Sequence, residues 1–332
     1  MKILVTGGTG FIGGHLVKKL IKNSHQIWCI VRSNSDKNKA RKLQNIGAKI
    51  LVGDLKNIKR INLPKKIDWV FHLAALVDTT DRFSYSKLYQ ENIKTTQDLA
   101  EFYLGRIKKF IFLSSMAAIG IRNQSRLVTE ETARQPQSNY GRSKLEAEEF
   151  LLKLYQEKKF PVVVLRPPTV YGPGERYNFL KLAQAIFKKR FWFIGSGRNL
   201  MSFCYVDNVV EAAILAAKSR KGIGKIFLID DGRPHSLKEI ASEIAKAEGV
   251  GLSSFSIPLS LAHLTGIGFE FLARILPIEP PLTRGRIVTL TANFAFDISK
   301  AKRILGYKPK VSFSEGVGQT IRSFEKEGLL TK

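Results

Sequence analysis

The first half of the chain alternates short apolar runs with longer amphipathic segments. The apolar runs are nearly continuous, which is typical of strands buried on both faces of a parallel sheet. They are KILVTG, QIWCIVR, AKILVGD, DWVFHLAA, KKFIFLSS and FPVVVLRP. The intervening segments predict helices over about 12–22, 36–46 and 90–104, and from Tyr140 onward. This alternation predicts a doubly wound α/β fold with a parallel sheet.

The second half of the chain lacks this regular alternation of strands and helices. A Pro/Gly-rich loop, PPTVYGPGE, follows Arg166, and two further strand-like runs appear later as MSFCYVD and KIFLIDD. Irregular, Pro-containing segments lie between and beyond them, which indicates a smaller lobe. We expect a first domain over 1–170 that also receives about 200–232 and 290–300. A C-terminal substrate lobe would come mostly from 171–199 and 233–332.

A glycine-rich loop connects the first predicted strand to the first helix. The stretch VTGGTGFIGGHLV spaces three glycines at intervals of three residues. Such glycines allow a tight turn, a close approach of the backbone to a pyrophosphate and close helix packing, while the helix N-terminus attracts negative charge. A turn without a ligand is the alternative. We expect a Rossmann-type domain whose cofactor lies against Gly7, Thr9, Gly10, Phe11, Ile12 and Gly13.

The residues after the second and third predicted strands bear on the choice of cofactor. Where dinucleotide-binding folds carry an acidic residue for the ribose 2′-hydroxyl, this chain has Arg32. A guanidinium pairs with a 2′-phosphate, so NADP(H) is preferred and NAD(H) is the second option. Arg32 could instead stack on adenine or face solvent. Asp54, beside Leu55, either accepts from the adenine amino group or caps the next helix.

Two residues near the start of one predicted helix have the spacing of a paired acid and cation. In SNYGRSKLEAEEF, Tyr140 and Lys144 stand four apart and therefore share a face. An ammonium beside a phenol stabilises the phenolate, so we expect Lys144 to lower the pKa of Tyr140. Lys144 can also hold the nicotinamide ribose. Ser114 and Ser115 end a strand, where such sheets bind ligands, and could polarise a substrate oxygen.

In their order along the chain, these motifs resemble the extended short-chain dehydrogenases/reductases, in the NAD-dependent epimerase/dehydratase superfamily. The matching stretches, from residue 6 to about 309, are TGGTGFIGG, GDL, HLAA, ENIKTT, FLSSMAAIG, YGRSK, RPPTVYGPG, YVDNVVEA and KAKRILGYKP. The resemblance implies that Tyr140 is the catalytic acid/base and that Lys144 supports it. It implies Ser115 as the catalytic hydroxyl, with Ser114 as second choice, and Asn92 as the residue that orders the proton relay.

The resemblance also implies a lining for the cofactor. The stretch after His72 would lie along it, and the loop from Pro167 to Thr169 would lie over the nicotinamide. The residues implied are Leu73, Ala74, Ala75, Pro167 and Thr169. A core histidine is the alternative for His72, and a plain helix-surface residue is the alternative for Asn92.

Neighbouring residues favour one reaction class. Dehydratases and decarboxylases of the family carry acidic residues after the catalytic hydroxyl, whereas this chain has Met116 and Ala117. Thr169 and Ile119 replace an Asn and a Tyr common in its sugar-nucleotide enzymes. These departures resemble the 3β-hydroxysteroid dehydrogenase and dihydroflavonol reductase branch, which implies hydride transfer between NADP(H) and a carbonyl/alcohol on a small, fairly apolar substrate. A nucleotide-sugar epimerase with tightly bound NAD and a non-enzymatic redox sensor or scaffold are the alternatives.

Charge and composition bear on partners. The net charge of +26 fits a Lys-rich solvated surface, a polyanionic partner or an anionic membrane. The basic residues are spread out and carry no nucleic-acid signature, so no nucleic-acid partner is expected. The stretch IPLSLAHLTGIGFEFLARILPIEPP predicts an amphipathic helix that packs in the core, roofs an apolar pocket or makes a peripheral membrane contact. The resemblance implies a homodimer through the Tyr140 helix and the long helix before it.

The sequence also bears on location and metals. It has no secretory signal and no run of about 20 apolar residues, so a cytoplasmic protein is expected. Cys29 and Cys204 lie in apolar strand-like runs without metal-ligand spacing. We therefore expect two buried thiols and no metal site.

Overall fold

The computed structural model describes residues 1–78, 81–120, 126–253, 255–275 and 284–330. Within these ranges the largest sheet has seven parallel strands in the order β11-β6-β5-β4-β1-β2-β3. They are β1 (Lys2–Thr6), β2 (Gln26–Val31), β3 (Lys49–Val52), β4 (Trp69–His72), β5 (Lys109–Leu113), β6 (Val162–Arg166) and β11 (Lys225–Leu228). The chain adds β2 and β3 on one side of β1 and then β4 and the later strands on the other side. A ligand crevice is therefore expected at this switch point, between β1 and β4. The predicted Rossmann-type α/β fold is confirmed.

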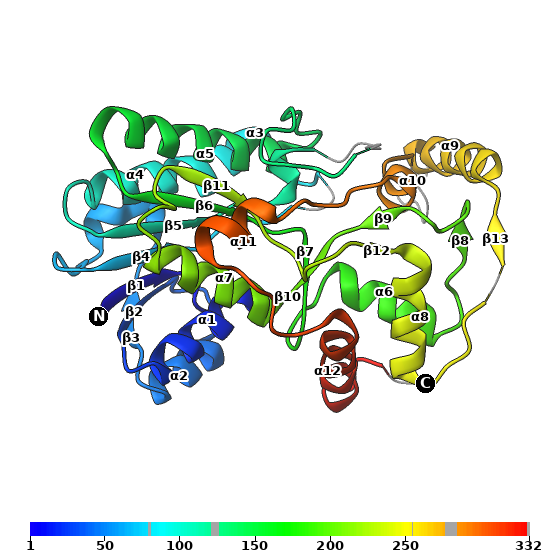
Figure 1. Ribbon diagram of the computed structural model, residues 1–332, viewed down its shortest axis with the longest axis horizontal. Coiled ribbons are helices and arrows are strands. Elements are labelled where there is room, and N and C mark those ends of the chain that lie inside the picture. Colours follow the sequence, from blue (N-terminus) through cyan, green and yellow to red (C-terminus); the bar gives the residue numbers. More distant parts are fainter. Residues whose placement is uncertain (79–80, 121–125, 254, 276–283, 331–332) are drawn as a thin grey trace.

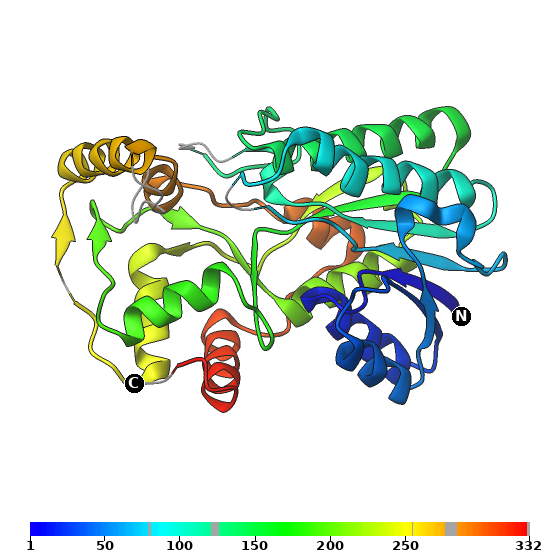
Figure 2. The same cartoon turned by 180° about the vertical axis from the view of Figure 1, so that it is seen from behind.

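Successive side chains of each strand point to opposite faces of this sheet, and helices cover both faces (Figures 1 and 2). On β5, Ile111 and Leu113 belong to one core, whereas Phe110 and Phe112 belong to the other. The first core is covered by α1 (Phe11–Lys22), α2 (Lys37–Asn45) and α7 (Val206–Lys218). The second is covered by η1 (Leu55–Arg60), α4 (Thr95–Phe102) and α5 (Asn139–Lys158). Burial on both faces explains why the strands are apolar at nearly every position.

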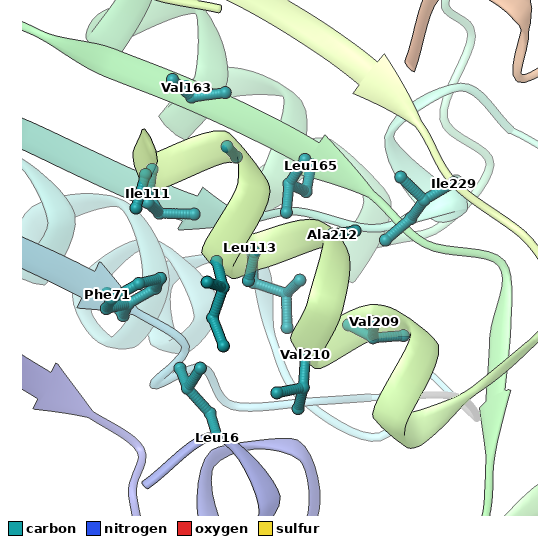
Figure 3. Close-up of a cluster of buried hydrophobic side chains, with 14 of the residues drawn as sticks. Leu16, Phe71, Ile111, Leu113, Val163, Leu165, Val209, Val210, Ala212 and Ile229 are labelled. Carbon is teal, nitrogen blue, oxygen red and sulfur yellow. The ribbon is translucent and has the colours of Figure 1, made fainter. Parts of the chain in front are cut away.

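Helix α7 brings the second half of the chain back to the first sheet. Figure 3 shows Val209, Val210 and Ala212 of this helix beside Leu113 and Leu165 of the sheet. Small alanines let the helix pack closely on the strands. Helix α11 (Ser299–Leu305) packs against α7 and β11 on the same side.

A second, smaller group of elements lies on the side away from the N-terminus (Figure 1). Its strands pair in twos, β7 with β10, β9 with β12 and β8 with β13. Its elements are β7 (Thr169–Tyr171), α6 (Asn178–Phe187), β8 (Phe193–Ile194), β9 (Leu200–Met201), β10 (Phe203–Tyr205), β12 (His235–Ser236), α8 (Leu237–Glu248), β13 (Ser256–Ile257), α9 (Leu259–Ile275), α10 (Arg284–Thr291) and α12 (Phe313–Lys326). Tyr171 is central to its core and packs against Phe179, Phe203 and Phe313.

The helix predicted over 90–104 begins earlier than expected and is not uniform. It starts as α3 (Tyr85–Leu88), continues through a π-helical turn, η2 (Tyr89–Lys94), and ends as α4. A π-helical turn changes the direction in which the following side chains point and is often found at functional sites. A short helix, η3 (Met116–Ala118), follows β5.

The predicted amphipathic helix is α9, and its described leucines point outward. Leu261 is 50% exposed and Leu264 is 67% exposed, whereas Ala262 is buried. These two leucines therefore do not pack in the core. Phe271, Leu272 and Ile275, which the same predicted helix includes, have side chains outside the described residues.

Candidate active site

The glycine-rich loop leaves the N-terminus of α1 open to an anion. Gly7 has a φ of +73°, and a Cβ there would lie 2.7 Å from the backbone nitrogen of Ala74. A Cβ on Gly13 would lie 2.1 Å from the carbonyl oxygen of Gly7, so only glycine permits this close packing. Gly10 is the N-cap of α1, with no capping side chain and no acidic residue in the first turn. The free N–H groups of that turn therefore fit a pyrophosphate.

Charged side chains gather beyond the ends of β2 and β3. The Nη1 atom of Arg32 lies 3.7 Å from Oε2 of Glu91. The ammonium of Lys56 donates to Oε1 of the same carboxylate at 2.7 Å. Asp54 caps η1 and accepts from the backbone nitrogen of Lys56 at 3.0 Å, and Leu55 is buried behind it. Lys56 and Glu91 have no signal in the local sequence, because only the fold brings them to Arg32.

Tyr140 and Ser115 meet where α5 begins against the end of β5. Tyr140 lies in the first turn of α5 and is buried, and the side chain of Ser115 acts to lower the pKa of its phenol. Ser115 also caps η3 by accepting from the backbone nitrogen of Ala117 at 3.2 Å. Gly141 makes this contact possible, because a Cβ there would lie 2.3 Å from the carbonyl oxygen of Ala117. Ser114 is buried, and its hydroxyl has no partner among the described residues.

Lys144 lies one turn after Tyr140 and points toward the same strand end. It is buried, and its ammonium donates to the carbonyl oxygen of Leu113 at 2.8 Å. The same ammonium lies 4.7 Å from the centre of the Phe112 ring. A backbone carbonyl and an aromatic face therefore hold the cation in place without neutralising it.

The charge states of this pair differ from the expectation. Burial raises the pKa of Tyr140 to about 12, and the hydrogen bond with Ser115 opposes that rise. Burial lowers the pKa of Lys144 to about 8, with the Glu148 charge acting in the opposite direction. The expected lowering of the Tyr140 pKa by Lys144 is wrong for this structure, because desolvation of the phenolate is the larger effect.

Asn92 ties the loop after β4 to α5. It is buried on η2, where its carboxamide accepts from the backbone nitrogen of Leu76 at 2.7 Å and donates to the Leu76 carbonyl at 3.1 Å. It also donates to the hydroxyl of Ser143 at 3.0 Å, and this hydroxyl donates to the carbonyl of Tyr140 at 2.8 Å. Asn92 is therefore no helix-surface residue, and its contacts fix the backbone that carries Tyr140.

His72 is a core histidine. One ring nitrogen lies 2.7 Å from the hydroxyl of Thr6 and the other 2.9 Å from the hydroxyl of Thr96. Burial lowers the pKa of His72 to about 3, so the ring is neutral. The hydroxyl of Thr6 also accepts from the backbone nitrogen of Ala74 at 3.2 Å. This network fixes the chain beside the glycine loop.

A fully buried ion pair, which the sequence analysis missed, lies behind Lys144. Glu148, one turn further along α5, accepts from Nε of Arg166 at 2.9 and 3.2 Å and also from Nη2. Both side chains are 0% exposed. The pair joins the helix of Tyr140 and Lys144 to β6, which leads into the loop at Pro167.

The other predicted lining residues lie at the carboxyl edge of the sheet. Leu73, Ala74 and Ala75 follow β4 and are partly exposed. Pro167 is buried, and its carbonyl accepts from the backbone nitrogen of Met116 at 2.9 Å, while Thr169 begins β7. Among the described residues, no group of three or more His, Cys, Asp or Glu side chains is placed to bind a metal ion. The helices of the described ranges include none with the length and apolarity needed to span a bilayer.

These features together define a class of protein. A glycine-lined helix N-terminus beside a Ser–Tyr–Lys group, at the carboxyl edge of a parallel sheet, is suited to a dinucleotide cofactor and a reacting oxygen. The family model described as the NAD dependent epimerase/dehydratase family matches residues 3–229. The chain belongs to this family and is an NAD(P)-dependent enzyme.

Similar proteins include both reductases and epimerases. The chain is 28% identical to a 4-hydroxy-2-methyl-3-oxo-4-farnesyl-3,4-dihydroquinoline-1-oxide ketoreductase of Stigmatella aurantiaca, covering 96% of this chain and 95% of the relative. It is 31% identical to UDP-glucose 4-epimerase of Vibrio cholerae, covering 97% and 95%. The structure of UDP-glucose 4-epimerase from Thermotoga maritima with UDP-glucose superposes with a TM-score of 0.76 at 26% identity, covering 98% and 99%. Relatives also include 3β-hydroxysteroid dehydrogenases, which confirms the resemblance.

Proposed function

We propose that this enzyme transfers hydride between NADP(H) and a carbonyl/alcohol pair on a small, fairly apolar substrate. The observation that carries the proposal is the burial of Tyr140 and Lys144 one turn apart on α5, with the Lys144 ammonium at the end of the strand that leads to Ser115. Met116 and Ala117 follow Ser115 and offer no acid or base for dehydration or decarboxylation. The ketoreductase relative, whose substrate name includes a farnesyl group, supports an apolar carbonyl compound.

The chain's own residues would handle the substrate oxygen and its proton. A bound nicotinamide supplies or accepts the hydride. The hydroxyls of Ser115 and Tyr140 would bond the reacting oxygen. With a pKa of about 12, Tyr140 keeps its proton at neutral pH and can donate it to the oxygen during reduction. Lys144 would stabilise the phenolate left behind, while Asn92 holds the helix backbone in place.

The preference for NADP(H) rests on two cations at the end of the sheet. Arg32 and Lys56 both contact the carboxylate of Glu91, so the two cations lie close together. A cofactor phosphate beyond the end of β2 could reach both. A 2′-phosphate binds well to such a pair of cations. Gly7, Gly10 and Gly13 would hold the pyrophosphate of either dinucleotide.

We expect NADPH to stabilise the protein more than NADH in a thermal-shift measurement. A ligand that binds only the folded state adds about 2.7 kcal/mol at a concentration of 100 times its Kd, so the tighter cofactor gives the larger shift at equal concentration. ADP-ribose with and without the 2′-phosphate serves as the control for the nicotinamide. Equal shifts with both dinucleotides would contradict the NADP(H) preference.

A nucleotide-sugar epimerase is the second candidate, favoured by the similarity to UDP-glucose 4-epimerases. It would use the same Ser115, Tyr140 and Lys144 but recycle its cofactor in place. Tightly co-purifying NAD and no net change in nicotinamide absorbance with any carbonyl substrate would favour the epimerase. Sustained NADPH oxidation would favour the reductase.

The exposed leucines of α9 support a peripheral contact with an anionic membrane. Leu259, Leu261 and Leu264 are exposed, and the chain carries a net charge of +26. We expect the protein to co-sediment with phosphatidylglycerol vesicles and much less with phosphatidylcholine vesicles at low salt. Equal recovery in both pellets would contradict the contact. The homodimer and the cytoplasmic location stay predictions.

A further inference from the structure

An acidic side chain lies among the cations that would bind the 2′-phosphate. The carboxylate of Glu91 lies 2.7 Å from the ammonium of Lys56 and 3.7 Å from the guanidinium of Arg32. Its side chain is only 16% exposed, whereas those of Arg32 and Lys56 are 54% and 40% exposed. The cations can therefore turn toward a ligand more easily than the carboxylate can leave its place.

The position of Glu91 follows from the π-helical turn η2. The next residue, Asn92, uses its side chain to hold the loop at Leu76. Glu91 points instead across to Lys56 at the start of η1. The carboxylate is thus fixed by the same turn that fixes the loop after β4, and it comes from an element far from β2 in the sequence.

The two forms of the cofactor would respond to this carboxylate in opposite ways. A 2′-phosphate is repelled by Glu91 and competes with it for Arg32 and Lys56. A ribose with free hydroxyls has no such repulsion, and a carboxylate accepts its hydroxyl bonds. Glu91 thus brings, from a different helix, the acidic group that the end of β2 lacks.

We propose that Glu91 limits the NADP(H) preference of this enzyme, weakening the binding of NADP(H) and supporting that of NAD(H), while Arg32 and Lys56 act in the opposite sense; this rests on the proposed function. Removing the carboxylate frees Arg32 from Glu91 and leaves Lys56 with the more distant Asp54 carboxylate at 3.7 Å, so both cations are more available to the 2′-phosphate. The same change takes away the Glu91 acceptor for the 2′-hydroxyl. Selectivity therefore depends on three side chains from three separate elements.

The test is a binding titration of the full-length protein by nicotinamide fluorescence, which requires no substrate. For Glu91→Gln we expect NADPH affinity to rise by about fivefold and NADH affinity to fall by about as much. For Lys56→Met we expect the NADPH affinity to fall. Asp98→Asn is the matched control, because it removes one acidic charge from the same helical stretch, where Asp98 pairs with Lys94 and contacts neither cation.

The outcomes separate this inference from the proposed function. A Glu91→Gln variant whose NADPH/NADH affinity ratio equals that of the unaltered protein would overturn the role of Glu91 alone. The same conclusion follows if Asp98→Asn shifts the ratio equally, because the effect would then be general charge. If neither dinucleotide binds the unaltered protein, the proposed function falls as well.

Discussion

Replacing Tyr140 by Phe is expected to lower turnover by a factor of about 10²–10⁴ and to leave NADPH binding nearly unchanged. In the proposed mechanism the buried phenol gives a proton to the reacting oxygen, and Phe would keep the ring and its packing. The measurement is the rate of NADPH oxidation with an apolar carbonyl compound that the unaltered protein reduces, together with a titration of NADPH binding.

The matched control is Tyr103→Phe. Tyr103, the residue just after α4, is also buried. Its hydroxyl donates to the carbonyl of Pro64 at 3.2 Å and not to a residue of the candidate site. We expect this variant to lose some stability and to keep its turnover. If Tyr140→Phe turned over substrate as fast as Tyr103→Phe, Tyr140 would not be the proton donor.

The direction of the Tyr140 pKa gives this prediction a physical reason. A phenol with a pKa of about 12 is protonated at neutral pH, which suits donation during carbonyl reduction. Alcohol oxidation needs a phenolate instead, which the ammonium of Lys144, one turn further along α5, would stabilise. We infer that burial of the phenol favours the reductive direction at neutral pH, whereas stabilisation by Lys144 acts for both directions.

The fold could be predicted from the sequence because its signals are local. A strand such as β5 is apolar at every position after Lys109, since it is buried on both faces, and its length can be identified without knowledge of its neighbours. The glycine loop is similarly local as a sequence signal, because its glycines lie within the single stretch VTGGTGFIGGHLV, between a strand and the next helix. The π-helical turn at η2 has no comparable pattern, so the start and regularity of that helix were not predicted.

The candidate site could be predicted only where a motif lies within one segment. Tyr140 and Lys144 share a helix, and their spacing alone indicates a common face. Glu91 and Lys56 come from separate elements, and their meeting with Arg32 depends on how two helices pack on the sheet. The pKa of Tyr140 depends on the depth of burial, which spacing does not give, and so its direction was predicted wrongly.

Glu148 is the clearest case of a residue whose burial the local sequence does not predict. Its replacement is expected to have the second large effect. In the sequence it stands in LEAEEF, a stretch typical of a solvated helix face, yet it is fully buried against Arg166. Removing one partner of a buried pair leaves an uncompensated charge and typically costs about 3–5 kcal/mol. We therefore expect Glu148→Gln to lower the free energy of unfolding by about 3–5 kcal/mol, as measured by urea denaturation with linear extrapolation.

The neighbouring residue provides the control. Glu149 lies beside Glu148 on α5, is 52% exposed, and pairs with Arg134 at 3.5 Å. Because exposed ion pairs contribute about 0–1 kcal/mol, Glu149→Gln should cost no more than that. Replacing both partners, as in Glu148→Leu with Arg166→Met, should cost less than Glu148→Gln alone, because no unpaired charge is left in the core. Equal losses for Glu148→Gln and Glu149→Gln would show that the buried pair has no special part in joining α5, with Tyr140 and Lys144, to the sheet.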